Sequence, residues 1–170
     1  IDFLKLDLNY KKISYTFTYG SIKGDSIGMD IKSKNIAFHR LNIKFSDIFK
    51  VGYYESVLIN NNPFSFVYFN PLSFITSADL NTGAKETTYN NTLMGFDFEI
   101  NPFRNLSVQG SLLIDDINFS TIFKNDITSF DNKFGYQIGT MWTNAFTIPD
   151  ISMVLEYTRL NPFVYSHRFN

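Results

Sequence analysis

Apolar and polar residues alternate with a period of two along most of the chain. In the first run, Leu4, Leu6 and Leu8 fall on one side. Lys5 and Asp7 fall on the other side. This is the pattern of a β-strand with one apolar and one polar face, whereas an amphipathic helix repeats about every 3.6 residues. The pattern recurs at residues 2–10, 13–20, 36–45, 48–56, 92–101, 105–115, 134–143 and 151–160. An all-β protein with eight strands is therefore predicted.

The connections between these runs alternate between short and long. The short ones lie at residues 11–12, 46–47, 101–105 and 144–150, and the long polar ones at residues 21–34, 56–90 and 116–133. Tight turns at one end, long loops at the other and strands of about 9–11 residues are typical of transmembrane β-barrels. We therefore predict one domain, residues 1–170, that is an antiparallel up-and-down transmembrane β-barrel. The alternative is a soluble antiparallel β-sandwich with its apolar face turned inward.

The direction of the strands predicts that the eight belong to a larger barrel. If the tight turns are periplasmic, the first strand begins and the last strand ends on the outer side. We expect a bacterial barrel to begin and end in the periplasm with an even strand number, which requires about ten strands or more. The missing strands of the same chain are therefore expected partners, because the eight alone would leave two open edges.

Composition narrows the class of protein. Aromatic residues make up 18% of the chain, and many lie where strands meet turns, as in the aromatic girdles of barrels. The net charge of -1 gives no basic surface, so no nucleic acid partner is expected. The chain has no Cys, and its two His residues, His39 and His167, are far apart. We therefore expect no catalytic site, no metal and no cofactor. The strand pattern and the aromatic residues together predict a protein in contact with membrane lipid, in the bacterial outer membrane.

Charged residues on the polar face are candidates for lining a lumen. They are basic in the first four predicted strands and acidic in the last four: Lys5, Arg40, Lys44, Lys50, Asp97, Glu99, Asp115 and Glu156. Opposed basic and acidic walls would create a field across the lumen for a small polar solute, as in a porin or transporter. Alternatively, the charges pair with one another or with a plug and make the barrel rigid.

The longest connection contains an aromatic-rich segment, residues 60–80. Pro63 and Pro71 argue against one continuous helix through this segment. Such a loop would fold inward as a plug, pack on itself, or present its rings to a ligand. Because sugars stack on aromatic rings, we take Tyr68 and Phe69 as candidate ligand contacts.

The stretch from Glu156 to Arg168 resembles the Wzi-like capsule-assembly barrels, in which a late strand ends in Glu and leads into a segment with Pro, Tyr and His. The matching positions are Glu156, Pro162, Tyr165 and His167. The resemblance implies an outer-membrane barrel, without enzymatic activity, that binds surface or capsular polysaccharide and supports capsule assembly or attachment. No ligand contact follows from it, and we add Tyr165 and His167 as candidate contacts ourselves. A porin or transporter and a soluble carbohydrate-binding or adhesin module are the alternative functions.

Overall fold

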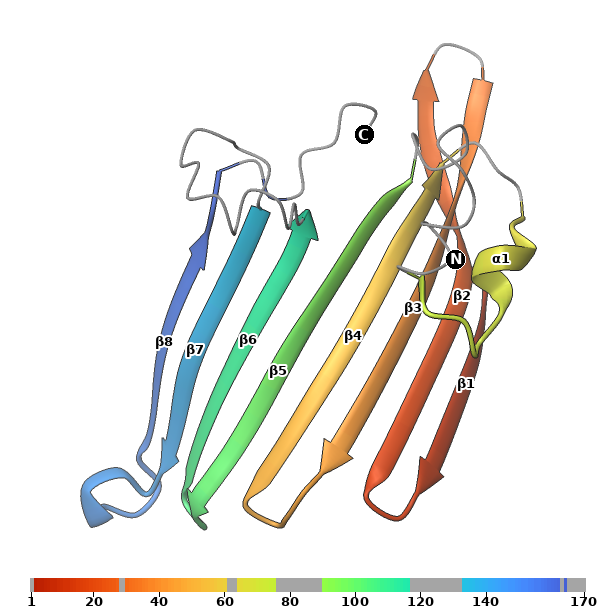
Figure 1. Cartoon of the computed structure of the whole chain (residues 1–170). Coiled ribbons are helices and arrows are strands. Elements are labelled where there is room, and N and C mark those ends of the chain that lie inside the picture. The colour runs from red at the N-terminus through yellow and green to blue at the C-terminus, as the bar shows by residue number, and fades with distance from the viewer. Residues whose placement is uncertain are drawn as a thin grey trace, which may run out of the picture. The chain divides into compact units, whose positions relative to one another are not determined.

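Eight strands form one open antiparallel sheet whose order follows the chain (Figure 1). The computed structural model describes residues 2–27, 30–60, 64–75, 90–116, 133–162 and 164. The strands are β1 (Asp2–Tyr10), β2 (Ile13–Ile27), β3 (Asp30–Lys44), β4 (Phe49–Asn60), β5 (Asn91–Phe103), β6 (Leu106–Asp116), β7 (Lys133–Thr143) and β8 (Ser152–Leu160). The predictions of an all-β protein and of eight up-and-down strands are confirmed.

The helical content of the described part of the chain is small. A single turn of helix, α1 (Phe66–Phe69), follows β4, and a short 3-10 turn, η2 (Ala145–Thr147), lies in the connection from β7 to β8. Neither of these described helices has the length and apolar character needed to cross a membrane. The brevity of α1 agrees with the expectation that prolines prevent a continuous helix here.

The two strands of the β2–β3 hairpin are longer than predicted. Residues 21–27 and 30–34 were expected in a long polar loop, but they belong to β2 and β3. β4 likewise continues to Asn60, beyond its predicted end at residue 56. The physical reason for residues 21–27 and 30–34 is that backbone groups form the sheet ladder, so strands can pair where neither face is apolar. Apolar alternation indicates only where one face is buried. Most of the other long connections, residues 76–89 and 117–132, lie outside the described residues.

The described residues divide between two compact units. Unit 1 contains residues 2–27, 30–41, 54–60, 64–75 and 90–94, and unit 2 contains residues 42–53, 95–116, 133–162 and 164. Each unit therefore has its own set of strand pairs and its own packing, and the two are taken in turn.

In both units the strand register keeps apolar side chains on one face. Leu6 of β1 pairs with Phe17 of β2 in unit 1. Ile138 of β7 pairs with Tyr157 of β8 in unit 2. Directly opposite residues of antiparallel strands project from the same side of a sheet. The faces predicted from each strand alone therefore coincide across these strand pairs, which we call the apolar face and the polar face of each unit.

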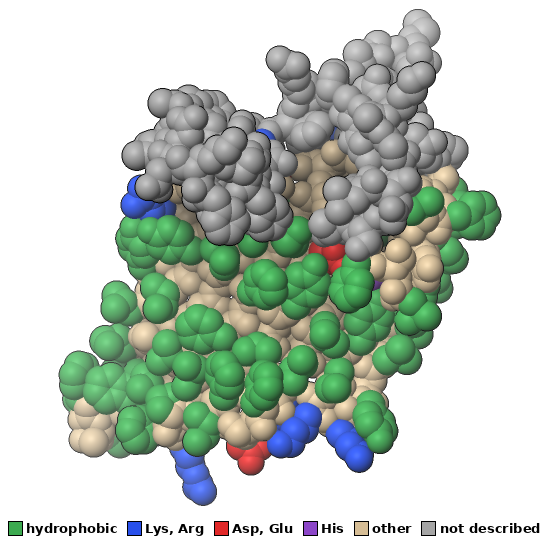
Figure 2. Space-filling model, in the orientation of Figure 1, with side chains coloured by type: hydrophobic (Ala, Val, Ile, Leu, Met, Phe, Trp, Pro, Cys, Tyr) green, Lys and Arg blue, Asp and Glu red, His purple; other side chains and the backbone are tan. Residues whose placement is uncertain are grey.

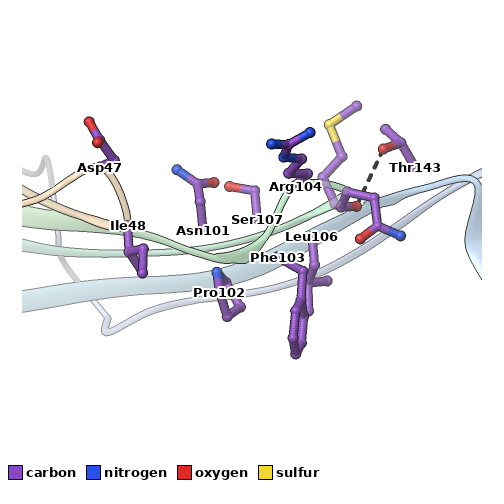
Figure 3. Close-up of a pocket in the computed structure, with 11 residues that line it drawn as sticks. Asp47, Ile48, Asn101, Pro102, Phe103, Arg104, Leu106, Ser107 and Thr143 are labelled. Carbon is purple, nitrogen blue, oxygen red and sulfur yellow. Dashed lines mark hydrogen bonds between the residues drawn. The ribbon is translucent and has the colours of Figure 1, made fainter.

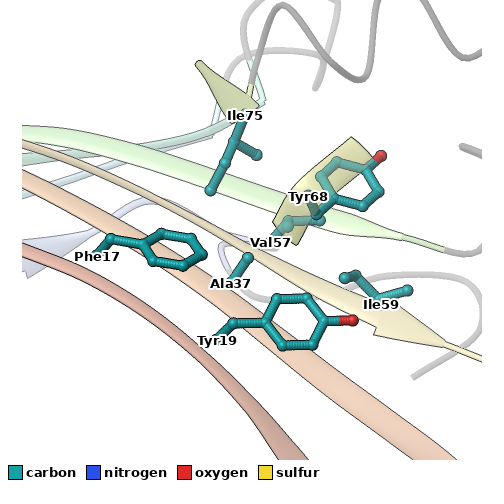
Figure 4. Packing of buried hydrophobic residues seen from close by; sticks show 7 residues of the cluster. All are labelled: Phe17, Tyr19, Ala37, Val57, Ile59, Tyr68 and Ile75. Atoms are coloured by element: carbon teal, nitrogen blue, oxygen red, sulfur yellow. The ribbon is translucent and has the colours of Figure 1, made fainter. Parts of the chain in front are cut away.

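Unit 1 has a buried core on its apolar face. Side chains of β2, β3 and β4 pack there beneath α1 and the residues that follow it (Figure 4). The cluster consists of Phe17, Tyr19, Ala37, Val57, Ile59, Tyr68 and Ile75. Hydrogen bonds fix the covering residues: the backbone N–H of Ser65 donates to the Tyr19 hydroxyl at 3.1 Å, and the Tyr15 hydroxyl donates to the Pro71 carbonyl. Residues 64–75, hereafter the covering segment, are thus attached to the sheet.

In unit 2 a glycine makes room for an aromatic ring. A Cβ atom at Gly110 of β6 would lie 2.4 Å from Cε1 of Phe98 on β5. Any side chain at this position must therefore displace the Phe98 ring, and a glycine in a strand interior commonly marks such a close approach.

Substitution of this glycine should destabilise the sheet. Gly110→Ala is expected to lower the free energy of unfolding by about 1–3 kcal/mol, the usual cost of forcing extra methyl groups into a packed site. Gly139→Ala is the matched control, because its Cβ would meet its nearest atom, the Leu155 carbonyl oxygen, at an ordinary 3.5 Å. Urea titration of the protein in detergent or lipid measures both variants. Equal stability of the two would contradict the packing of Phe98 over Gly110.

Candidate functional site

Large parts of the apolar face are exposed in each unit. Leu4 in unit 1 is 53% exposed, and Leu155 in unit 2 is 68% exposed. Figure 2 shows hydrophobic side chains over much of the face turned to the viewer. Soluble monomers rarely expose apolar patches of more than a few hundred Å². Exposed apolar surface of this kind commonly marks contact with protein, ligand or membrane.

The polar face carries charges that are paired within each unit. In unit 1, Lys5 Nζ lies 2.8 Å from Asp7 Oδ2, and the Thr16 hydroxyl donates to Asp7 Oδ1 at 2.7 Å. In unit 2, Lys50 Nζ donates to Glu99 Oε1 at 2.9 Å. Lys50 and Glu99 are members of the predicted basic and acidic sets, yet they lie on neighbouring strands. This pair favours the interpretation in which the charges rigidify the sheet over the interpretation with opposed walls.

Three other predicted lumen residues have local partners. Arg40 lies over the ring of Tyr54, 5.9 Å from its centroid, and Lys44 forms a 2.6 Å ion pair with Asp47 in the β3–β4 turn. Glu156 is exposed on β8 and accepts a 3.4 Å hydrogen bond from Thr158. Lys44 is thus held at the tight-turn end of the sheet.

Two acidic members of the predicted lining differ in their surroundings. Asp97 is half-buried on β5. Asp115 is buried and stands where the β6–β7 register shifts, between Ile114 and Asp116. Such an irregularity changes the direction of a side chain relative to a regular strand. Strict alternation therefore predicts the direction of the Asp115 side chain less well than that of the other predicted lumen residues.

The predicted ligand contacts on the covering segment are used for packing. Tyr68 is buried, and its hydroxyl accepts a 3.1 Å hydrogen bond from Asn90. The Phe69 ring meets the Tyr19 ring edge to face, with centroids 5.3 Å apart. Both rings thus take part in packing on the apolar face of unit 1. Tyr165 and His167 lie outside the described residues.

The covering segment also encloses a polar group of side chains. Glu55 of β4 is 0% exposed, and His39 of β3 is buried with its ring edge-to-face against Phe17, centroids 5.0 Å apart. His39 Nδ1 and the Tyr15 hydroxyl are 2.7 Å apart. The same hydroxyl donates to the Pro71 carbonyl, so Tyr15 links the imidazole to the covering segment. The imidazole is thus oriented by the segment that covers it.

The sequence analysis did not single out Glu55. The signal was present, because Glu55 interrupts an apolar row on β4 that continues with Val57 and Ile59. A carboxylate and an imidazole in one cluster resemble the groups used for acid–base chemistry. Here both side chains are buried, and His39 is linked through Tyr15 to Pro71 of the covering segment.

A pocket of about 400 Å³ lies in unit 2, at the tight-turn end of the strands (Figure 3). Asp47, Asn101, Arg104 and Ser107 extend to one side of the backbone in this view, while Phe103 extends to the other. The complete lining is Asp47, Ile48, Asn101, Pro102, Phe103, Arg104, Asn105, Leu106, Ser107, Met141 and Thr143. The pocket lies between turns and carries no constellation for catalysis. Within the described ranges, no group of three His, Cys, Asp or Glu residues is placed to hold a metal ion.

Comparison with known proteins identifies no relative of this chain. No family model, no curated protein and no solved structure matches it. The resemblance to capsule-assembly barrels therefore gains no support from these comparisons.

Proposed function

We propose that this chain forms part of the wall of a β-barrel in the bacterial outer membrane. In this proposal the apolar faces contact lipid, and the polar faces line an aqueous interior. The observation that carries the proposal is the exposed apolar face, which lies opposite a face of Gly, Ser, Thr and paired charges. A lipid-facing surface needs no protein cover, whereas the same surface in water would be a strong aggregation site.

The lengths of the strands support the same proposal. The shortest described strands, β1 and β8, have nine residues each, and β2 and β3 have 15 each. A tilted strand needs about 9–11 residues to cross the hydrocarbon core, while strands of soluble proteins average about 5–6 residues. Lys11 lies in a tight turn of unit 1 and Arg104 in a tight turn of unit 2, and in the proposal both side chains would meet the headgroups.

Closure of the sheet is a requirement of the proposal. β1 and β8 each have one neighbouring strand in the described sheet. Each unpaired backbone N–H or C=O group costs several kcal/mol in lipid. A membrane-spanning sheet must therefore close so that its edge strands are paired. β1 and β8 would therefore pair with further strands of the protein.

Two more specific functions are proposed for such a barrel. Binding of surface or capsular polysaccharide, in support of capsule assembly or attachment, rests on the resemblance of the C-terminal stretch. Passage of a small polar solute rests on the charged polar face, where Lys50 and Glu99 are about 40% exposed and accessible to solvent. Conductance in a planar bilayer separates the two, because a barrel closed by its loops should conduct little and a porin should conduct steadily.

Cell fractionation of the full-length protein tests the membrane proposal. We expect recovery in the outer-membrane fraction and a change of gel migration on heating, because a closed barrel resists detergent until its ladder of hydrogen bonds is broken. A soluble, monodisperse product with β-type circular dichroism would contradict the barrel and would favour the β-sandwich. Denaturation before loading provides the unfolded reference for the gel.

A further inference from the structure

The covering segment has a second surface that points away from the sheet. Its inner surface packs on β2, β3 and β4 through Tyr68 and Ile75. On the outer surface Phe66 is 81% exposed and Leu72 is 84% exposed, and Phe74 is also exposed. The twelve residues of the segment, FSFVYFNPLSFI, include no Asp, Glu, Lys or Arg. An uncharged segment with exposed phenylalanine and leucine on its outer side is chemically suited to lipid and poorly suited to bulk water.

Part of the backbone of this segment is hydrogen-bonded within the protein. Four of its N–H groups donate within the protein: Ser65 to the Tyr19 hydroxyl, Phe69 to the Ser65 carbonyl, Leu72 to the Asn70 side chain and Ser73 to the Asn70 carbonyl. Pro71 has no N–H to satisfy, and its carbonyl accepts from Tyr15. Irregular backbone is excluded from lipid chiefly because its polar groups lack partners. That cost is reduced here.

We propose that the covering segment lies at the boundary between headgroups and acyl chains, with Phe66, Leu72 and Phe74 in contact with lipid. The inference rests on the proposed function, since it assigns lipid to the apolar face of the strands. The segment sits on this same face, so its outer surface is directed toward whatever the face itself contacts. The partner is therefore the bilayer, at the boundary where its headgroups meet the acyl chains.

The buried polar side chains explain why a covering segment is favourable at this place. Glu55 and His39 lie on the apolar face, where direct contact with hydrocarbon would be costly for an ionisable side chain. The covering segment replaces that polar patch with an uncharged surface of Phe and Leu. It thereby extends the lipid-compatible surface over a part of the sheet whose own side chains are unsuited to lipid.

Depth-dependent quenching of a fluorophore tests this inference. The chain has no Cys, so a nitrobenzoxadiazole label can be attached after Phe66→Cys, Leu6→Cys or Thr18→Cys in the full-length protein. The unsubstituted protein treated with the same reagent serves as the blank. The labelled proteins are folded into phosphatidylcholine vesicles that contain lipids with a nitroxide placed either shallow or deep on the acyl chain.

The label at position 66 should lose more fluorescence to the shallow nitroxide than to the deep one. The label at position 6, on the apolar face of β1, should be quenched by the deep nitroxide, and the label at position 18, on the polar face, by neither. Quenching at position 6 without quenching at position 66 would overturn the inference and leave the barrel proposal intact. Absence of quenching at both positions would overturn the barrel proposal as well.

Discussion

Ile138→Arg should lower the free energy of unfolding in lipid bilayers by about 2–4 kcal/mol. This is the cost of an arginine on the lipid face of a barrel at the bilayer midplane. Ile138 lies in the middle of β7 on the apolar face and pairs with Tyr157 of β8. Its side chain is exposed in the described structure. In the proposed barrel this position faces the acyl chains, where a guanidinium loses its hydration without gaining a partner. Urea titration in vesicles measures the loss.

Two control variants distinguish whether lipid or protein contacts the apolar face at Ile138. Gln137→Arg changes the adjacent residue of β7, which lies on the polar face, and should cost little. Met153→Arg is on the apolar face near the tight turns and should cost about 0–1 kcal/mol, as near a membrane interface. An equal cost at residues 138 and 153 would show that the face is packed against protein. An equal cost at residue 137 would exclude an aqueous interior.

Phe17→Ala should lower the free energy of unfolding by about 3–5 kcal/mol, the usual cost of truncating a buried phenylalanine. Phe17 is at the centre of the unit 1 core and meets both His39 and Phe69 edge to face. Because the covering segment encloses it, neither lipid nor water readily fills the space left by the ring. We also expect faster proteolysis within residues 64–75, because the segment loses part of its attachment to the sheet.

Leu8→Ala is the matched control for this prediction. Leu8 lies on the same apolar face, pairs with Tyr15 of β2 and is exposed instead of covered. Its truncation removes apolar contact without leaving a cavity and should cost clearly less than truncation of Phe17. An equal loss in both variants, or unchanged proteolysis in Phe17→Ala, would show that the covering segment does not depend on the core beneath it.

The alternation of side chains was sufficient to predict the eight strands and the residues on each face. It was sufficient because one face of each strand is nearly uniform in polarity, so a shift by one residue would invert the whole pattern. The alternation could not predict that residues 21–27 continue β2, since pairing there involves backbone groups and leaves no apolar signature. It also gave no account of Asp115, where the register shifts.

The candidate site was harder to predict than the fold. Tyr68 and Phe69 occur in a predicted loop, where aromatic rings suggest contact with a ligand. Only the tertiary structure reveals that both rings pack against side chains of β2, β3 and β4. The reverse holds for Phe66 and Leu72, which the same packing leaves exposed. Glu55 was detectable as an interruption of an apolar row, but the sequence does not say which segment covers it.

The position of the covering segment has a consequence for the order in which the sheet assembles. Each strand pairs with its neighbour in sequence, and the longest described gap between paired strands separates β4 from β5, at residues 61–90. Closing this connection costs about 2 kcal/mol more in chain entropy than closing a two-residue turn. Docking of residues 64–75 onto β2, β3 and β4 shortens the free chain before β5 arrives. We therefore expect the first four strands and this segment to form early in folding, and the later strands to add one hairpin at a time.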